Sequence, residues 1–530
     1  MMMNIIKLVL VRNYSTIILI FLLFLGSFLR FNTYLQNFSF YADAARDTLV
    51  AKHMIFYDGF AHVAPGASSR WHLINNSPVY FWVLAICWFF LRSPTLMPLP
   101  FVFAGIWSIY ISYKIGEALE NKNLGLTFAF FVAVSNSLVR FSFSVYQPYL
   151  IPLLTVLSCY FLLLTFKTNN LIWLFMASLC VFLGLHMHYS FLPVFIIFSL
   201  WIFFSIIKSF KKTNAVLLLL FVIFLCVQAL LWIYLTSIKT PFDQFSFFSE
   251  LLTRSQQNHM LKTLLIIRGM ALVDYIFSTN YRLSLVPLML GTVVWGSVPL
   301  IIISDIRHKK YYGIFFASLA ASVIITSLYV NHDLPNSLYP HYFSPYLIIF
   351  PLCLALVIHQ YIPSKPCRLI VILAIGYFLT KGNTMNYHNR FNNIAVFQKI
   401  AQVIVDDAKT YSLQNTEYWV LDHNPKDPQF NYYIGQYYYF LEDITGKQLV
   451  KLTSEEQNIT PINPDPKAYY LVCSWFSVKT TQNELNNKCL MPFIHDSAYR
   501  TKKLTSHYVG AIVSNTNAFY MFRFDLRQHF

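Results

Sequence analysis

LIWLFMASLCVFLGLHMHYSFLPVFIIFSLWIFFSIIK, residues 171–208, contains no Asp, Glu, Lys or Arg before its last residue. A helix needs about 17 to 25 predominantly apolar residues to cross the hydrocarbon core of a bilayer. The stretch is too long for one crossing and long enough for two, with the polar turn HMHYS at 186–190 between them. We therefore predict two membrane-spanning helices, at 171–187 and 190–207.

The composition of the whole chain extends this prediction. Of its 530 residues, 56% are hydrophobic and 12% are charged, against about 25% charged residues in ordinary soluble domains. The net charge is +16, but the basic residues fall in short clusters between apolar runs, which is typical of topology signals rather than of a nucleic-acid surface. We expect contacts with membrane lipids and none with nucleic acid.

Similar apolar stretches recur along the first 382 residues. Eleven predicted spans lie near 14–31, 97–113, 124–139, 147–166, 171–187, 190–207, 214–236, 284–304, 313–330, 342–361 and 368–382. A further apolar stretch, SPVYFWVLAICWFFL at 77–91, is shorter and begins with Ser-Pro. If this stretch crosses the membrane, every loop after it lies on the opposite side from where it would otherwise lie.

The basic residues decide the assignment of 77–91. If the N-terminus is cytoplasmic and 77–91 does not cross, the basic clusters between spans are cytoplasmic, as the positive-inside tendency requires. These residues are Lys7, Arg12, Lys114, Lys122, Lys167, Lys208, Lys211, Lys212, Arg307, Lys309, Lys310, Lys365 and Arg368. One more crossing inverts every later loop, so we predict that 77–91 is a re-entrant or interfacial helix.

This topology gives two domains. Residues 1–382 form a transmembrane module that includes the external loops 32–96 and 237–283, and residues 383–530 form a small extracytoplasmic domain. In that domain the runs EYWVLDH, KAYYLVCSW, HYVGAIVS and AFYMFRFD predict strands, and FNYYIGQYYYFLEDITG predicts a helix that ends at Gly446. We therefore expect a polytopic α-helical membrane protein with an α+β C-terminal domain.

Two of the eight cysteines, Cys473 and Cys489, lie in the polar C-terminal domain. An oxidising compartment allows them to form a disulfide, and two free thiols are the alternative. The other six lie in or beside apolar segments, where a thiol behaves as a small hydrophobe.

The first external loop contains the acidic motif ADAARDTLVAKHMI, residues 42–55. As a helix it places Asp43, Arg46 and Asp47 on one face, while Leu49 and its apolar neighbours suit contact with the membrane surface. A carboxylate beside an arginine suits a general base that activates a hydroxyl next to a cation that binds phosphate. The alternative is an ordinary ion pair in an acidic first turn.

Further polar residues on the same predicted side are candidates for substrate contact. Arg70 and Arg268 are additional cations for a phosphate. The candidates for binding a sugar or phosphate at the mouths of spans are Arg140, Tyr149, His188, Tyr189, His341 and Tyr342. The alternative for these aromatic residues is an interfacial belt. The loop histidines match no compact ligand pattern, so we predict no metal site, although a divalent cation remains open.

Several signatures of other functions are absent. The sequence has no GxxxxGK[ST], GxGxxG, HExxH or GxSxG motif, which argues against nucleotide-driven enzymes and α/β-hydrolases. The predicted spans contain almost no ionisable side chain in their interiors, which argues against an ion-coupled transporter.

The order of these features resembles glycosyltransferase family 39 of the GT-C superfamily, in particular the bacterial branch related to the aminoarabinose transferase of lipid A and, more remotely, protein O-mannosyltransferases. The likeness extends to about residue 380 and is carried by ADAARDTLVAKHMI, SPVYFWVLAI, YQPYLIP, GLHMHYS and PHYFSPYLIIFP. It implies Asp43 as the catalytic acid residue and Arg46 as a contact to the donor phosphate. Ala44 stands where the family commonly has a second acid, and Asp47 is a candidate substitute.

The resemblance implies an enzyme of the bacterial plasma membrane that moves a sugar from a polyprenyl-phosphate donor, such as an undecaprenyl-phosphate sugar, to a lipid, glycan or protein acceptor. Modification of lipopolysaccharide is one such activity. A single displacement at the anomeric carbon implies inversion. No cofactor is assigned, and a divalent metal is the alternative. The alternatives are a transporter or flippase of lipid-linked saccharides, a polysaccharide polymerase or ligase, and a receptor-like scaffold.

Overall fold

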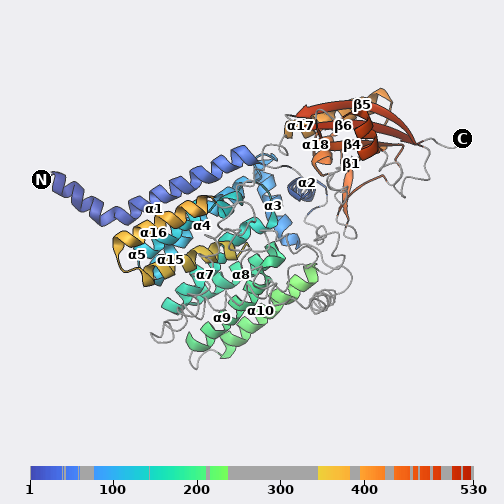
Figure 1. The fold of residues 1–530 in the computed structure, drawn as a ribbon. Coiled ribbons are helices and arrows are strands. Elements are labelled where there is room, and N and C mark those ends of the chain that lie inside the picture. The colour runs from blue at the N-terminus through green and yellow to red at the C-terminus, as the bar shows by residue number, and fades with distance from the viewer. Residues whose placement is uncertain are drawn as a thin grey trace, which may run out of the picture. The chain divides into compact units, whose positions relative to one another are not determined.

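A computed structural model shows two compact units (Figure 1). The helical unit comprises Met1–Leu35, Pro98–Phe143 and Gln147–Asn386, and the mixed unit comprises Gln36–Met97, Ser144–Tyr146 and Tyr387–Phe530. The structure describes the chain except for residues 1, 39, 41–42, 58, 60–76, 143, 210–214, 237–343, 382–393, 424–434, 454–457, 464–465, 478–480, 491–503, 515–516 and 527–530.

Long apolar helices make up the helical unit. Those at predicted spans are α1 (Met2–Asn37), α4 (Leu99–Leu119), α5 (Lys122–Val134), α7 (Ile151–Thr168), α8 (Leu171–Met187), α9 (Leu192–Ser209), α10 (Ala215–Thr236), α15 (Tyr346–Tyr361) and α16 (Lys365–Lys381). The short elements are α6 (Asn136–Arg140), η1 (Gln147–Leu150) and η2 (Tyr189–Phe191). The predicted spans 284–304 and 313–330 lie outside the described residues.

Length and composition agree with a membrane environment. In the described part of the chain, four helical stretches are long and apolar enough to cross on their own: Asn13–Leu35, Leu99–Leu119, Gln147–Thr168 and Tyr189–Ile207. Several shorter apolar helices accompany them. The chain is therefore a multi-pass membrane protein.

Local sequence signals set where these helices begin and end. Asn169, in the left-handed conformation with φ of 50°, ends α7, and the Asn170 side chain caps α8 by accepting a hydrogen bond from the Ile172 amide at 2.9 Å. Asn tolerates both roles better than most residues. The two adjacent asparagines therefore produce the tight turn that pairs α7 with α8.

A four-stranded sheet forms the centre of the mixed unit. Its strands are β1 (Tyr418–His423), β4 (Ala468–Ser477), β5 (Leu504–Ser514) and β6 (Asn517–Leu526), in the order β1-β4-β6-β5, with only the β1–β4 pair parallel. The other elements are α2 (Asp43–Phe56), α3 (Pro78–Leu91), α17 (Ile394–Thr410), α18 (Gly435–Thr445), β2 (Val450–Thr453), β3 (Asn458–Pro461), α19 (Gln482–Leu485) and a π-helical turn, Asn486–Leu490. All four predicted strands and the predicted helix before Gly446 are confirmed.

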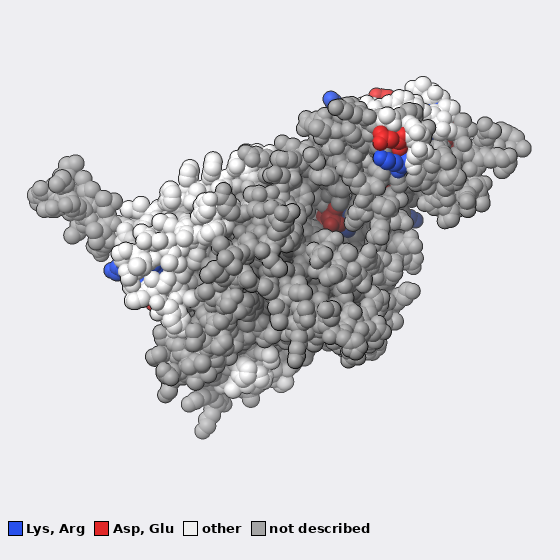
Figure 2. All heavy atoms as spheres, viewed as in Figure 1, with Lys and Arg blue, Asp and Glu red and all other residues white. Residues whose placement is uncertain are grey.

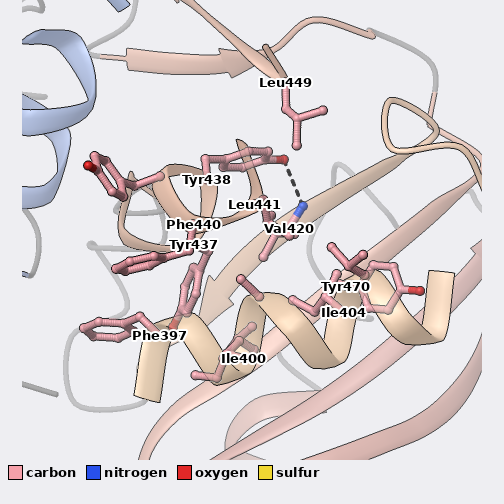
Figure 3. Close-up of a cluster of buried hydrophobic side chains, with 14 of the residues drawn as sticks. Phe397, Ile400, Ile404, Val420, Tyr437, Tyr438, Phe440, Leu441, Leu449 and Tyr470 are labelled. Atoms are coloured by element: carbon pink, nitrogen blue, oxygen red, sulfur yellow. Dashed lines mark hydrogen bonds between the residues drawn. The ribbon is translucent and has the colours of Figure 1, made fainter. Parts of the chain in front are cut away.

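Strand β4 is buried on both faces. Because successive side chains of a strand point to opposite faces, Tyr470 and Val472 join the large core formed with α17 and α18, while Tyr469 and Leu471 join a smaller core on the other side. Figure 3 shows the large core, in which the Val420 amide donates to the Tyr438 hydroxyl at 3.0 Å.

A disulfide closes the smaller core. It joins Cys473 of β4 to Cys489 of the π-helical turn, with a Cα–Cα distance of 6.0 Å. The structure thus selects the paired alternative for these two cysteines.

Helix α2 corrects two expectations from the sequence. From the sequence we expected loop 32–96 to belong with the spans, but Gln36–Met97 forms one compact unit with Tyr387–Phe530. Leu49 and Val50 are buried in protein, and Leu49 lies in the same core as α17 and α18. The expected apolar surface for the membrane is therefore a contact with the domain, because partners distant in sequence cover it.

Helix α3 corresponds to the apolar stretch 77–91. It has 14 residues, about 21 Å at the rise of an α-helix, against a hydrocarbon core of about 30 Å. Ser77 caps its start by accepting a hydrogen bond from the Val79 amide, and Arg92 ends it in the left-handed conformation. This length suits the predicted non-crossing helix, whose membrane position stays a prediction.

Candidate active site

The first turn of α2 brings three charged side chains together. Arg46 Nη1 lies 2.9 Å from Asp43 Oδ1, while its Nε and Nη2 donate to Asp47 Oδ1 at 2.9 and 2.7 Å. Helical spacing alone produces the Asp43–Arg46 pair, and the positive N-terminal end of the helix favours a carboxylate at Asp43. One guanidinium is therefore held between two carboxylates.

Burial separates the two carboxylates. The exposed fraction of the side chain is 32% for Asp43, 14% for Arg46 and 0% for Asp47. Burial raises the pKa of Asp47 to about 6, and Arg46 opposes that rise by stabilising the charged form. Asp43 is therefore the more exposed carboxylate, and Asp47 is the buried one that accepts two hydrogen bonds from Arg46.

Tyr80 of α3 completes the surroundings of Asp47. Its hydroxyl and Asp47 Oδ2 are both buried. The hydroxyl lies close enough to favour the charged form of Asp47 and so opposes, weakly, the rise in the pKa of that carboxyl. Packing of α3 against α2 thus encloses the carboxylate.

The other end of α2 is anchored to α18. His53 Nε2 contacts both oxygens of Glu442, at 3.0 and 2.8 Å, with both side chains fully buried. Lys52 Nζ lies 2.6 Å from Asp443 Oδ1 and 4.7 Å from the centroid of the Tyr439 ring. The C-terminal domain therefore positions the helix that carries Asp43 and Arg46.

Glu442 also accepts hydrogen bonds from the backbone within the domain. Its Oε1 accepts the backbone amides of Leu449, at 2.9 Å, and Val450, at 3.4 Å. A buried carboxylate needs such donors because desolvation of its charge is costly. Glu442 therefore links α2, α18 and the start of β2 through one side chain.

The predicted His-Tyr pair lies in the helical unit. The ring Nδ1 of His188 lies 3.0 Å from Ser190 Oγ and accepts the Ser190 amide at 3.1 Å, so His188 caps η2 at the end of α8. Ser190 Oγ lies 3.3 Å from Ser344 Oγ, and the Tyr189 ring contacts Trp232. These contacts give the pair a clear structural role.

The other candidates fall in three groups. Tyr149 stacks on Phe141 with ring centroids 4.5 Å apart, and Arg140 lies in the last turn of α6; both belong to the helical unit. The structure brings Asp43, Arg46 and Asp47 into contact through ion pairs. Arg70, Arg268, His341 and Tyr342 lie outside the described residues.

Sequence reasoning missed Arg30 of α1. Its guanidinium is fully buried and donates to the carbonyls of Gly26, Ala133 and Val132, at 3.1, 3.3 and 3.1 Å. A charged side chain within a predicted span was the available signal, because such residues are costly and commonly functional.

The residues missed around α2 were Lys52, His53, Tyr80, Glu442 and Asp443. Nothing in the sequence pairs His53 with Glu442, which are 389 positions apart. Among the described side chains, no group of three or more His, Cys, Asp or Glu is arranged to hold a metal ion.

Comparison with solved structures identifies the fold of this chain. No family model matches the chain, and no curated protein does. Crystal structures of ArnT from Cupriavidus metallidurans, in the apo state and bound to undecaprenyl phosphate, are similar at 10% identity and a TM-score of 0.54, covering 96% of this chain and 98% of ArnT. The Archaeoglobus fulgidus oligosaccharyltransferase in complex with Zn and sulfate matches at 11% identity and a TM-score of 0.48, covering 86% of this chain and 67% of that chain. The likeness to ArnT along nearly the whole of both chains shows that this chain has the fold of ArnT.

Proposed function

We propose that this protein is a membrane glycosyltransferase that moves a sugar from a polyprenyl-phosphate donor to an acceptor hydroxyl or amine. The observation that carries the proposal is the charged first turn of α2, where Arg46 lies between Asp43 and Asp47, in a chain with the fold of ArnT. The complex of the similar ArnT with undecaprenyl phosphate supports a lipid phosphate as part of the donor.

Asp47 is proposed as the residue that orients Arg46. A guanidinium binds phosphate best when its planar fork is fixed in advance. Two hydrogen bonds to a fully buried carboxylate supply that fixation. Breaking a buried pair costs about 3–5 kcal/mol, so Arg46 stays attached to Asp47 while substrates come and go.

Asp43 is proposed as the general base. Its ion pair with Arg46 is partly exposed, and such pairs contribute about 0–1 kcal/mol. A donor phosphate can therefore replace Asp43 at Arg46 Nη1 at little cost. Phosphate binding then releases Asp43 to accept a proton from the acceptor.

The reaction is a single displacement. The acceptor oxygen or nitrogen attacks the anomeric carbon while Asp43 takes its proton, and the bond from that carbon to the phosphate oxygen breaks. The leaving polyprenyl phosphate keeps the electron pair, and Arg46 stabilises the charge that develops on it. One displacement inverts the configuration at the anomeric carbon.

The location and acceptor follow the same proposal. We place the reaction on the extracytoplasmic face of a bacterial plasma membrane, where a flipped lipid-linked sugar is the sensible donor, with a lipid, glycan or protein acceptor. Modification of lipopolysaccharide fits this scheme. Arg70, Arg268, His341 and Tyr342 remain proposed substrate contacts, as do Arg140, Tyr149, His188 and Tyr189.

Cysteine labelling tests the orientation. Ser93 is partly exposed and Glu120 is exposed in the structure, and the proposed topology places only residue 93 outside. A membrane-impermeant maleimide should therefore label Ser93→Cys and spare Glu120→Cys in intact cells. Labelling of Glu120→Cys alone would show that the topology is inverted.

Sugar transfer is tested with Asp43→Asn. Membranes containing the protein receive a panel of polyprenyl-phosphate sugars, and the new glycosidic bond is followed by mass spectrometry. We expect Asp43→Asn to reduce transfer by at least 100-fold, in the range typical of general-base catalysis, while Asp406→Asn, at an exposed carboxylate of α17, leaves the rate unchanged. Equal rates for parent and Asp43→Asn in properly inserted protein remove Asp43 as the base. Movement of donor across vesicles with no new bond indicates a flippase instead.

A further inference from the structure

The helical unit contains a groove of about 360 Å³ that involves none of the residues discussed for sugar transfer. This volume lies within the usual range for small-ligand sites. Helices α1, α5, α15 and α16 line it, with Ile18, Leu22, Asn123, Leu126, Thr127, Phe130, His359, Lys365, Arg368, Leu369, Ile372 and Leu373. All these lining residues lie in the described part of the chain.

One end of the groove is basic. Arg368 Nε and Nη2 donate to the Ile362 carbonyl at 2.9 and 2.8 Å, which satisfies a carbonyl just beyond the end of α15. Lys365 is exposed one turn earlier, at the first residue of α16. The lining set contains no Asp or Glu, so the groove presents two cations without a carboxylate of its own.

A chain of polar contacts keeps Arg368 in place. Thr127 Oγ1 donates to the Asn123 carbonyl at 3.0 Å and lies 2.9 Å from His359 Nε2. Arg368 Nη1 lies 3.4 Å from His359 Nδ1. Arginine can only donate, so Nδ1 accepts and Nε2 carries the proton that it donates to Thr127. A neutral His359 therefore supports the arginine and adds no charge.

The remaining walls are apolar and open. Leu369 and Leu373 of α16 are 56% and 55% exposed, and Ile18 of α1 is 40% exposed. In a multi-pass membrane protein such side chains contact hydrocarbon. Figure 2 shows that the described surface over α1 and α16 is almost entirely uncharged on the face in view, with basic atoms at one end.

We propose that this groove binds one anionic membrane phospholipid. The phosphate lies at Lys365 and Arg368, and an acyl chain follows Leu369, Leu373 and Ile18. Basic pockets between transmembrane helices bind phosphate headgroups in this manner. Free phosphate would leave the apolar walls unused, and a zwitterionic lipid would bring a further positive charge beside Lys365 and Arg368. The proposal does not depend on sugar transfer.

Native mass spectrometry of the whole protein tests this site. The protein is incubated with phosphatidylglycerol, phosphatidylcholine or inorganic phosphate, and retained ligand is counted under increasing activation. We expect phosphatidylglycerol to be retained at least fivefold more than phosphatidylcholine, and Lys365→Gln to weaken its retention roughly fivefold, as about 1 kcal/mol per basic residue predicts.

Lys167→Gln is the matched control, since Lys167 is an exposed lysine in the last turn of α7 and does not line the groove. It should leave retention unchanged. Arg368→Lys keeps the charge while changing the cap of α15, so it should bind more lipid than Arg368→Gln at equal folding. Equal retention of the two lipids, equal effects of Lys365→Gln and Lys167→Gln, or full competition by inorganic phosphate each overturn the proposal.

Discussion

Asp47 shows how burial decides the role of a carboxylate within one turn of helix. It lies four residues after Asp43 and contacts the same guanidinium. Asp43 remains partly exposed, whereas Asp47 is covered on every side. A general base must be able to contact its substrate, whereas a residue that orients another side chain must stay fixed. The two acids therefore suit different tasks although their local sequence is similar.

The pH dependence of transfer should report Asp47. Burial raises the pKa of Asp47 to about 6, so acid below that pH neutralises it and loosens its hold on Arg46. We expect kcat/KM to fall as the pH decreases through 6, roughly tenfold per unit once one group is titrated. Asp47→Asn should be slow at every pH and should lack this step. An unchanged step near pH 6 in Asp47→Asn would assign it to another group.

The raised pKa of Asp47 also affects the stability of the fold, with a pH dependence opposite to that expected for transfer. Because the folded pKa of Asp47 lies above its ordinary value of 3.8, the folded state binds a proton more tightly than the unfolded state between these two values. Its contribution to stability is therefore largest in acid and is lost as the pH rises through 6. The active form of the site is thus maintained at some cost in stability.

At the scale of elements, His53 and Glu442 join two helices that are far apart in the sequence. Glu442→Ala removes the buried carboxylate that His53 and the Leu449 amide contact. We expect a loss of about 3–5 kcal/mol, as for other broken buried pairs, measured as a lower thermal midpoint in detergent.

Asp443→Ala is the matched control on the same helix. Asp443 is 46% exposed, and Lys52 still has Glu442 at 3.8 Å when Asp443 is removed. Its loss should therefore be much smaller. Similar midpoints for the two variants would mean that Glu442 does not anchor α2.

Helices α4 and α5 pack through a contact between glycines. A Cβ added at Gly116 would lie 2.5 Å from both Cα and N of Gly125, which are backbone atoms that cannot rotate away. Small residues allow membrane helices to approach this closely. Gly116→Ala should therefore lower the thermal midpoint of the purified protein by several degrees. Gly510→Ala, whose Cβ would meet ordinary contacts at 3.8 Å and beyond, should not, and equal midpoints would show that the contact is unimportant.

The sequence was informative where the signal is local. Apolar length predicted the spans, alternation predicted the strands of the C-terminal sheet, and helical spacing predicted the contact of Asp43 with Arg46. Arg30 was overlooked because its partners are backbone carbonyls from another helix. The apolar side of α2 was assigned to lipid because hydrophobicity alone does not distinguish a membrane surface from a protein core.

At the scale of the whole molecule, each of the two compact units is built from segments that are not consecutive in the sequence. The mixed unit takes Gln36–Met97 from before most of the spans and Tyr387–Phe530 from after them. Phe40, Ala45 and Leu49 lie in one core with Phe397 and its neighbours in the C-terminal domain. Local sequence patterns cannot reveal contacts between such distant segments.

This division predicts that the C-terminal domain is incomplete without the first loop. A fragment of residues 387–530 lacks Phe40, Ala45 and Leu49, so it exposes apolar surface that the whole chain buries. It also lacks His53, which removes one of the partners of the buried Glu442. We expect the fragment to bind a hydrophobic dye and to be degraded rapidly by trypsin. A protein in which 36–97 is joined to 387–530 by a flexible linker should bind little dye and resist trypsin.

The linked protein carrying Leu49→Asp controls for the added length and should behave like the short fragment. Equal protease resistance of the short and linked proteins would show that the C-terminal domain folds independently and that α2 only docks on its finished surface.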